Sequence, residues 1–69
     1  QYADTSPAQY LSQIRFLRAK KLLDTTELTV AEIAYRLRFE TPSHFSTFFR
    51  KREGVPPQQY RRERRQPGR

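Results

Sequence analysis

The sequence is poor in the residues that build metal sites and nucleotide-binding loops. Its 69 residues include no cysteine, one histidine and two glycines. Without cysteine the chain forms no disulfide and no thiolate metal site, and nothing near His44 completes a set of metal ligands. Two glycines provide no glycine-rich loop for a phosphate group, and no two acidic residues are placed to act together. The sequence therefore predicts a protein that is not an enzyme and that uses no metal or other cofactor.

Long hydrophobic runs are also missing. No stretch approaches the ~20 apolar residues that cross a bilayer, and no signal peptide is visible. We therefore expect no membrane partner and a location in a bacterial or other cytoplasm. At 69 residues the chain can form one small domain with a limited hydrophobic core.

Acidic residues are few in the second half of the chain, where the positive charge gathers. The formal net charge is +7. Residues 1–40 hold six Lys or Arg against five acids, whereas residues 41–69 hold eight against two. Charge concentrated in one part of a domain is typical of surfaces that bind a phosphate backbone. A basic surface that only increases solubility is the alternative.

Helix-start signals divide the chain into four predicted helices and indicate an all-α fold. Thr29 can cap a helix with Glu32 completing a capping box, and Thr41 can cap another that opens with Pro42. Gly54 fits the left-handed position that ends a helix. The predicted helices comprise residues 7–23, capped by Ser6, and residues 30–37, 42–53 and 57–64. The domain is expected to span residues 6–62, with fraying from Arg61 and a basic tail over residues 63–69.

The two capped helices within residues 30–53 have the spacing of a helix-turn-helix. Their caps lie twelve residues apart, which fits one short helix and a turn of three to four residues. At 100° per residue, Phe45, Phe48 and Phe49 fall on one side of the second helix, near Arg52, and are assigned to the core. Small polar and basic side chains fall on the other side. This arrangement predicts a small homeodomain-like helical domain whose second motif helix lies in a DNA groove.

Position along this helix separates residues that would contact bases from residues that would contact phosphates. Base edges are reached from the first two turns of a recognition helix. Ser and Thr hydroxyls bond to bases with little preference, and a Thr methyl or Pro ring can touch a thymine methyl. The predicted base-proximal residues are Glu40, Pro42, Ser43, Ser46 and Thr47. The predicted phosphate-contacting residues are Thr29, Thr41, His44, Arg50 and Lys51.

Several of these residues also have a purely structural interpretation. Glu40 could accept a bond from a cytosine amino group, or could simply favour the helix N-terminus. His44 fits a capping or packing role. The C-terminal arginines fit non-specific phosphate contacts or solvated charge. Ser43, Ser46 and Thr47 would be ordinary surface residues outside a helix-turn-helix.

The first predicted helix is apolar on two sides. Its apolar residues spread over well over half of the circumference, which is typical of a helix that packs between two bodies. They are Tyr10, Leu11, Ile14, Phe16, Leu17, Ala19, Leu22 and Leu23. Residues 4–10 also resemble residues 54–60, since both runs place a proline helix start before a tyrosine. These features predict that residues 1–5 are the exit of a preceding helix-turn-helix unit.

Five sequence motifs together resemble one family. They are S-P-x-x-Y-L from Ser6, R-F-x-x-A-K-x-L-L from Arg15, V-A-E-I-A from Val30, S-H-F-S-x-F-F-R-K from Ser43 and G-V-P-P-x-x-Y-R from Gly54. With these motifs, residues 6–62 resemble the AraC/XylS class of bacterial transcription regulators. The resemblance implies two helix-turn-helix units joined by a long helix, with the recognition helices in successive major grooves. This chain would supply the joining helix and the second unit, while the first unit and a separate effector-sensing and dimerisation domain belong to the full-length protein.

Three residues depart from the family pattern. Arg38 stands where glycine is usual, at a cost on the order of 1 kcal/mol if its φ is positive. Glu53 stands at an often aromatic position, which removes packing, and Pro56 provides a weaker cap for the last helix. All three lie off the predicted DNA-contacting face, so they affect stability rather than function.

The sequence therefore predicts a sequence-specific DNA-binding domain of a bacterial transcription regulator. Residues 42–53 would lie in the major groove of double-stranded DNA, and the bound protein would be associated with the nucleoid. Two other functions stay open. The motif could contact RNA polymerase or another regulator subunit, in which case random duplex would give no gel shift at low salt. A basic amphipathic membrane binder would be helical only with anionic lipid.

Overall fold

The computed structural model describes residues 7–65, and these form four α-helices with no strand among them. The helices are α1 (Pro7–Thr25), α2 (Val30–Arg36), α3 (Pro42–Glu53) and α4 (Pro57–Arg64). The all-α prediction is confirmed, and the bounds of α3 and α4 are as predicted. α1 continues two residues beyond the predicted end at Leu23, and α2 stops at Arg36 with Leu37 as its C-cap. The predicted Ser6 cap and the predicted exit segment at residues 1–5 lie outside the described residues.

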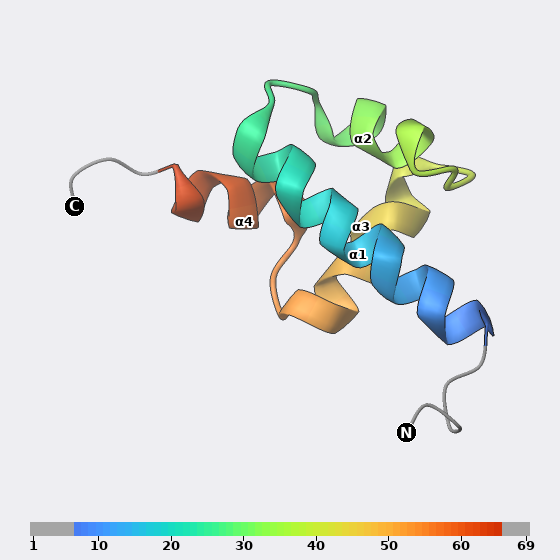
Figure 1. The fold of residues 1–69 in the computed structure, drawn as a ribbon. Helices are drawn as coiled ribbons and strands as arrows, with labels where there is room; N and C mark the ends of the chain where they lie inside the picture. Colours follow the sequence, from blue (N-terminus) through green and yellow to red (C-terminus); the bar gives the residue numbers. More distant parts are fainter. Residues whose placement is uncertain (1–6, 66–69) are drawn as a thin grey trace.

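α1 runs the length of the domain and the three shorter helices gather on it (Figure 1). It packs against α2 and α4, and α3 packs against the same two helices. The core lies where the four helices meet, and every helix contributes to it. Its buried hydrophobic residues are Ala19, Leu23, Ile33, Ala34, Leu37, Phe39, Phe45, Phe49 and Tyr60.

Aromatic rings provide much of this small core. The Phe39 ring, in the turn before α3, lies 5.3 Å from the Phe45 centroid and 5.0 Å from that of Phe48. Further along the same side of α3, the Phe49 ring lies 5.4 Å from Phe16 of α1 and 5.3 Å from Tyr60 of α4. Tilted and edge-on pairs at such distances add stability beyond the area that they bury. The rings therefore hold α3 against α1, α4 and the turn that precedes it.

The turn between α2 and α3 has the hydrogen bonds of a Schellman motif. The Arg38 N–H donates to the Tyr35 carbonyl at 3.1 Å, and the Phe39 N–H donates to the Ala34 carbonyl at 3.0 Å. Arg38 itself has φ 71, so the family's usual glycine position does require a left-handed backbone. Gly54 closes α3 in the same region with φ 96, as predicted.

The other two departures from the family pattern have different consequences. Glu53 forms an ion pair with Lys20 of α1 at 3.3 Å, so the position still links α3 to α1 although it carries no ring. Pro56 gives α4 no side-chain cap hydrogen bond, in line with the weaker cap predicted from the sequence.

Candidate nucleic-acid interface

The rotation of α3 about its own axis is set by its caps and its phenylalanines. The Thr41 hydroxyl accepts the His44 N–H at 3.1 Å, and Pro42 occupies the first turn. Phe45 and Phe49 are fully buried, and Phe48 is half-buried with the Arg52 guanidinium 4.9 Å from its ring centroid. The predicted buried side of α3 is therefore confirmed, and the opposite side faces solvent.

The solvent side of α3 carries the residues that the sequence nominated as base-proximal. Ser43 and Thr47 are exposed, and Ser46 and Pro42 are half-buried. One shallow surface depression is lined by Pro42, Ser43, Ser46, Thr47, Arg50 and Pro56. Glu40 is exposed in the preceding turn and does not line this depression. The structure thus brings together four of the five nominated residues, although their roles toward DNA stay predictions.

Sequence reasoning missed Pro56 as part of this surface. Gly54, in the left-handed region, reverses the chain after α3 and returns Pro56 beside the helix. The glycine was a visible signal for the reversal, but nothing local indicated which side of α3 the chain would return to. Pro56 adds a second proline ring to a surface that Pro42, three hydroxyl residues and the Arg50 guanidinium also line.

The predicted phosphate-contacting residues are all exposed, but their free donors differ. The Thr29 N–H donates to Glu32 Oε1 at 2.8 Å, and the Thr29 hydroxyl accepts the Glu32 N–H at 3.0 Å. The capping box therefore leaves the hydroxyl proton as the donor of Thr29. The Thr41 hydroxyl, which accepts the His44 N–H, likewise keeps its proton for a phosphate.

The other three predicted phosphate-contacting residues, Arg50, Lys51 and His44, differ in what surrounds their side chains. Within residues 7–65, neither Arg50 nor Lys51 has an ion-pair partner, so both cations face solvent uncompensated. The exposed His44 ring stands edge-on to Phe39 with centroids 5.6 Å apart, which gives it the packing role considered from the sequence. Among the predicted phosphate-contacting residues, Arg50 and Lys51 are thus the ones that carry free positive charge.

The expectation of fraying from Arg61 is wrong for the described part of the chain. Arg61 and Arg65 donate hydrogen bonds to backbone carbonyls at the end of α1, and Arg64 forms an ion pair with Asp24 at 3.0 Å. The pKa of Arg64 is raised, chiefly by its hydrogen bond to Asp24. These three arginines therefore have partners within the domain, and any contact of theirs with phosphate stays a prediction. For Arg61 and Arg65 the reason is that a helix C-terminus presents carbonyls with no partner in the helix, and guanidinium groups can bond to them.

The described residues were also compared with the requirements for a metal site and for a membrane-spanning helix. In residues 7–65 no group of three or more histidine, cysteine or acidic side chains is arranged to hold a metal ion. Within the same span, no helix has both the length and the apolar character needed to cross a membrane.

Comparison with known proteins identifies the family. The family model described as "Helix-turn-helix domain" matches residues 1–63. The HTH-type transcriptional activator RhaS of Enterobacter sp. (strain 638) is 38% identical over 64 residues, which are 93% of this chain and 23% of that protein. The chain thus spans about a quarter of the length of this curated relative.

Two solved structures share the fold at clear sequence identity. An AraC-type transcriptional regulator from Chromobacterium violaceum matches with a TM-score of 0.87 and 34% identity, over 99% of this chain and 61% of that one. The DNA-binding domain of AdpA, solved in complex with a target DNA, matches with a TM-score of 0.81 and 36% identity, over 96% and 62%. Taken with the capped helix pair and its solvent-facing second helix, these matches show that the chain belongs to the AraC-type family of helix-turn-helix domains of transcription regulators.

Proposed function

We propose that this chain is a sequence-specific DNA-binding domain of a bacterial transcription regulator, with α3 lying in the major groove. The observation that carries the proposal is the orientation of α3. Its phenylalanines are buried, so Ser43, Thr47 and Arg50 face outward together. An α-helix about 10–12 Å across fits the ~12 Å width of the major groove. The AdpA domain, which matches this chain closely, was solved with its target DNA bound.

Base recognition would come from the first two turns of α3. The hydroxyls of Ser43, Ser46 and Thr47 can donate to or accept from base edges, and the Thr47 methyl and Pro42 ring can touch a thymine methyl. Glu40, in the turn before α3, can accept from a cytosine amino group. Pro56 extends the apolar part of the same surface. Hydroxyls discriminate weakly between bases, so we expect modest specificity from this unit alone.

Phosphate contacts would surround this surface. Arg50 and Lys51 supply uncompensated charge on one side of α3, and Thr29, Thr41 and His44 supply neutral donors at the helix starts. Each neutralised phosphate makes the logarithm of the binding constant fall by about 0.9 per log unit of salt. Binding by this domain should therefore weaken markedly as salt is raised.

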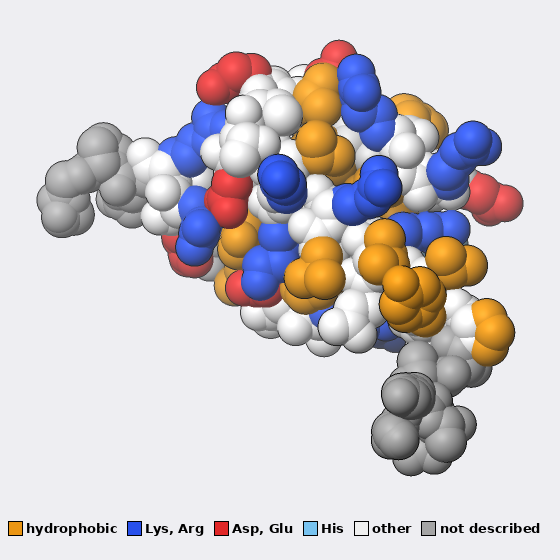
Figure 2. All heavy atoms as spheres, viewed as in Figure 1, with side chains coloured by type: hydrophobic (Ala, Val, Ile, Leu, Met, Phe, Trp, Pro, Cys, Tyr) orange, Lys and Arg blue, Asp and Glu red, His pale blue; other side chains and the backbone are white. Residues whose placement is uncertain are grey.

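The rest of the regulator is also part of the proposal. Tyr10, Leu11 and Leu17 of α1 are each more than half exposed, and Figure 2 shows hydrophobic side chains gathered over the N-terminal half of this helix. This supports a preceding helix-turn-helix unit packed on α1. A separate effector and dimerisation domain elsewhere in the protein belongs to the same proposal and follows from the family resemblance. RNA polymerase is a further proposed partner, and we expect the complete regulator to act in the cytoplasm, at the nucleoid.

A selection from a random duplex pool at two salt concentrations tests the proposal. We expect enrichment of a short motif at low salt and loss of binding at high salt. Thr47→Ala should relax the preference at one base pair by up to ~1–3 kcal/mol. Thr25→Ala, which removes an exposed hydroxyl from the end of α1, should leave the selected motif unchanged. Failure of the wild-type domain to shift any duplex at low salt would refute the proposal and favour a protein-binding module.

A further inference from the structure

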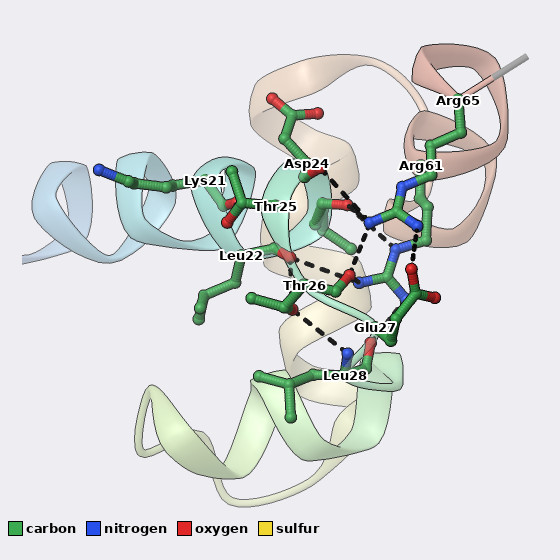
Figure 3. A network of polar contacts seen from close by, with 10 residues as sticks. Lys21, Leu22, Asp24, Thr25, Thr26, Glu27, Leu28, Arg61 and Arg65 are labelled. Carbon is green, nitrogen blue, oxygen red and sulfur yellow. Dashed lines mark hydrogen bonds and ion pairs between the residues drawn. The ribbon is translucent and has the colours of Figure 1, made fainter. Parts of the chain in front are cut away.

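Arg61 of α4 is bound to the backbone of the segment that joins α1 to α2. Figure 3 shows its guanidinium directed into the bend of that segment. Its Nη1 donates to the Leu28 carbonyl at 2.6 Å, and its Nε donates to the Leu23 carbonyl at 3.1 Å. Its Nη2 donates to the carbonyls of Thr26 at 3.1 Å and Leu22 at 3.4 Å. One side chain therefore holds four carbonyls across the end of one helix and the approach to the next.

Arg65, one turn further along α4, forms a second layer on the same segment. Its Nη2 donates to the Thr26 carbonyl at 2.6 Å, and its Nη1 pairs with Glu27 Oε2 at 2.9 Å. Longer bonds from Nη2 reach the carbonyls of Leu23 at 3.3 Å and Asp24 at 3.4 Å. We call the group formed by Arg61 and Arg65 the arginine clamp.

The local sequence explains why the clamp is needed. α1 ends at Thr25, its last turn has no basic residue, and the next glycine of the chain is Gly54. The final carbonyls of α1 thus lack both a glycine C-cap and a favourable charge from their own helix. Guanidinium groups meet both needs, because they carry positive charge and offer several donors in one plane.

Through the clamp and its neighbour Tyr60, α4 contacts elements at both helices of the helix-turn-helix. The Leu28 carbonyl that Arg61 holds immediately precedes Thr29, the N-cap of α2. Tyr60, the neighbour of Arg61, packs edge-on to Phe49 of α3 with centroids 5.3 Å apart. α4 is therefore attached to the start of α2 through Arg61 and to the core face of α3 through Tyr60.

From these contacts we infer that Arg61 is a positioning residue for DNA binding. It fixes the segment before α2 while α4 supports α3, and so sets how the two helices are presented to a duplex. The inference rests on the proposed function. A lysine cannot replace the arginine, because an ammonium group lacks the planar fork that reaches carbonyls in different directions. The positive charge of Arg61 is used inside the domain and does not contact phosphate.

Arg61→Lys is the informative variant, since it keeps the charge and most of the stem but removes the fork. Arg62→Lys and Arg62→Ala are the matched controls, because Arg62 is exposed on the same helix and has no ion-pair partner among residues 7–65. Dissociation constants are measured for the selected duplex and for a random duplex over a range of salt, below the temperature at which each variant begins to unfold. Folding is checked by circular dichroism.

We expect Arg61→Lys to bind the selected duplex roughly two- to thirtyfold more weakly, with little change on random duplex. The salt slope should stay at the wild-type value for Arg61→Lys and Arg61→Ala. The readout is the specificity ratio, which is the dissociation constant for random duplex divided by that for the selected duplex. The two Arg62 variants should leave this ratio unchanged. Simple destabilisation would not alter this ratio while the domain is folded. If Arg61→Lys does not fold, Arg65→Lys tests the outer layer of the clamp. It should lower the specificity ratio, as Arg61→Lys is expected to do.

Three results would overturn the inference. The first is a wild-type ratio in both Arg61→Lys and Arg65→Lys. The second is a fall in salt slope of about 0.9 in Arg61→Ala, which would make Arg61 a phosphate contact. The third is a wild-type domain that binds neither duplex. In that case the proposed function fails, and faster amide exchange at residues 26–30 in Arg61→Lys would limit Arg61 to a structural role.

Discussion

Replacing Arg38 with glycine should stabilise this domain. Arg38 has φ 71 at the position where the Schellman motif closes α2, and it is the one non-glycine residue with positive φ among residues 7–65. An L-residue in the left-handed region costs roughly 1–2 kcal/mol because its Cβ crowds the following carbonyl. Glycine avoids this cost but loses ~0.5–1 kcal/mol through the greater freedom of the unfolded chain.

The side chain of Arg38 contributes nothing that offsets this gain. It is exposed, and within residues 7–65 it has no ion pair. The net effect of Arg38→Gly is therefore a stabilisation of about 0.5–1 kcal/mol. For a domain of this size that corresponds to a rise in Tm of roughly 2–8 °C. The assay is urea unfolding followed by circular dichroism, with the same measurement repeated on heating.

Two controls isolate the backbone contribution. Arg38→Ala removes the same side chain but keeps the Cβ, so it should leave the free energy of unfolding near the wild-type value. Gly54→Ala introduces a Cβ at φ 96, where no atom beyond the neighbouring residues lies within 4 Å of the added carbon, and should destabilise by roughly 1–2 kcal/mol through local backbone strain. A domain made less stable by Arg38→Gly, with Arg38→Ala neutral, would show that the left-handed residue carries no strain here.

Three further changes test other parts of the structure. Arg50→Ala should weaken all duplexes alike and lower the salt slope by about 0.9, whereas Arg36→Ala, at a residue of α2 that does not line the depression on α3, should leave the slope unchanged; equal slopes for both variants would contradict the docking orientation. Burial, aided by the Asp24 carboxylate, raises the pKa of Tyr60, so the folded state favours the protonated phenol. Its stabilisation is complete below the unfolded pKa of about 10 and is lost as pH rises above it, so Tyr60→Phe should flatten the alkaline decline in Tm, and an unaltered decline would exclude Tyr60 as its source. Glu32→Ala removes one bond of the capping box and should cost ~0.5–1 kcal/mol in urea unfolding, and no loss would show that the box is open in solution.

The starts of the helices could be predicted because their signals are local. The Thr29 capping box and the Thr41 cap with Pro42 each act within three residues of the chain, and the structure contains both. The spacing of Phe45 and Phe49 likewise determined which face of α3 is buried, and hence which residues face outward. Periodicity and capping depend only on neighbours in sequence, so they can be recognised before any tertiary contact is known.

The contacts that the sequence could not reveal all join distant segments. The end of α1 at Thr25 depends on arginines 36 or more residues further along the chain, and Lys20 pairs with Glu53 across two helices. Arg61 and Arg65 were therefore counted as tail charge, because nothing beside them in the sequence shows the carbonyls that they meet. Pro56 joins the outer surface of α3 for the same reason.

The long-range contacts of the arginines change how much positive charge is available to a partner. Eight Lys or Arg lie in residues 41–69, and the sequence treated them as one basic region facing a partner. The structure divides them: Arg61, Arg64 and Arg65 are bound to α1 and its following segment, whereas Arg50 and Lys51 remain uncompensated beside the outer face of α3. Part of the positive charge thus stabilises the fold by occupying a helix C-terminus, where cations are favourable. Net charge therefore overstates the charge available to a duplex, and the specificity of this surface depends on the few cations that remain free together with the hydroxyls between them.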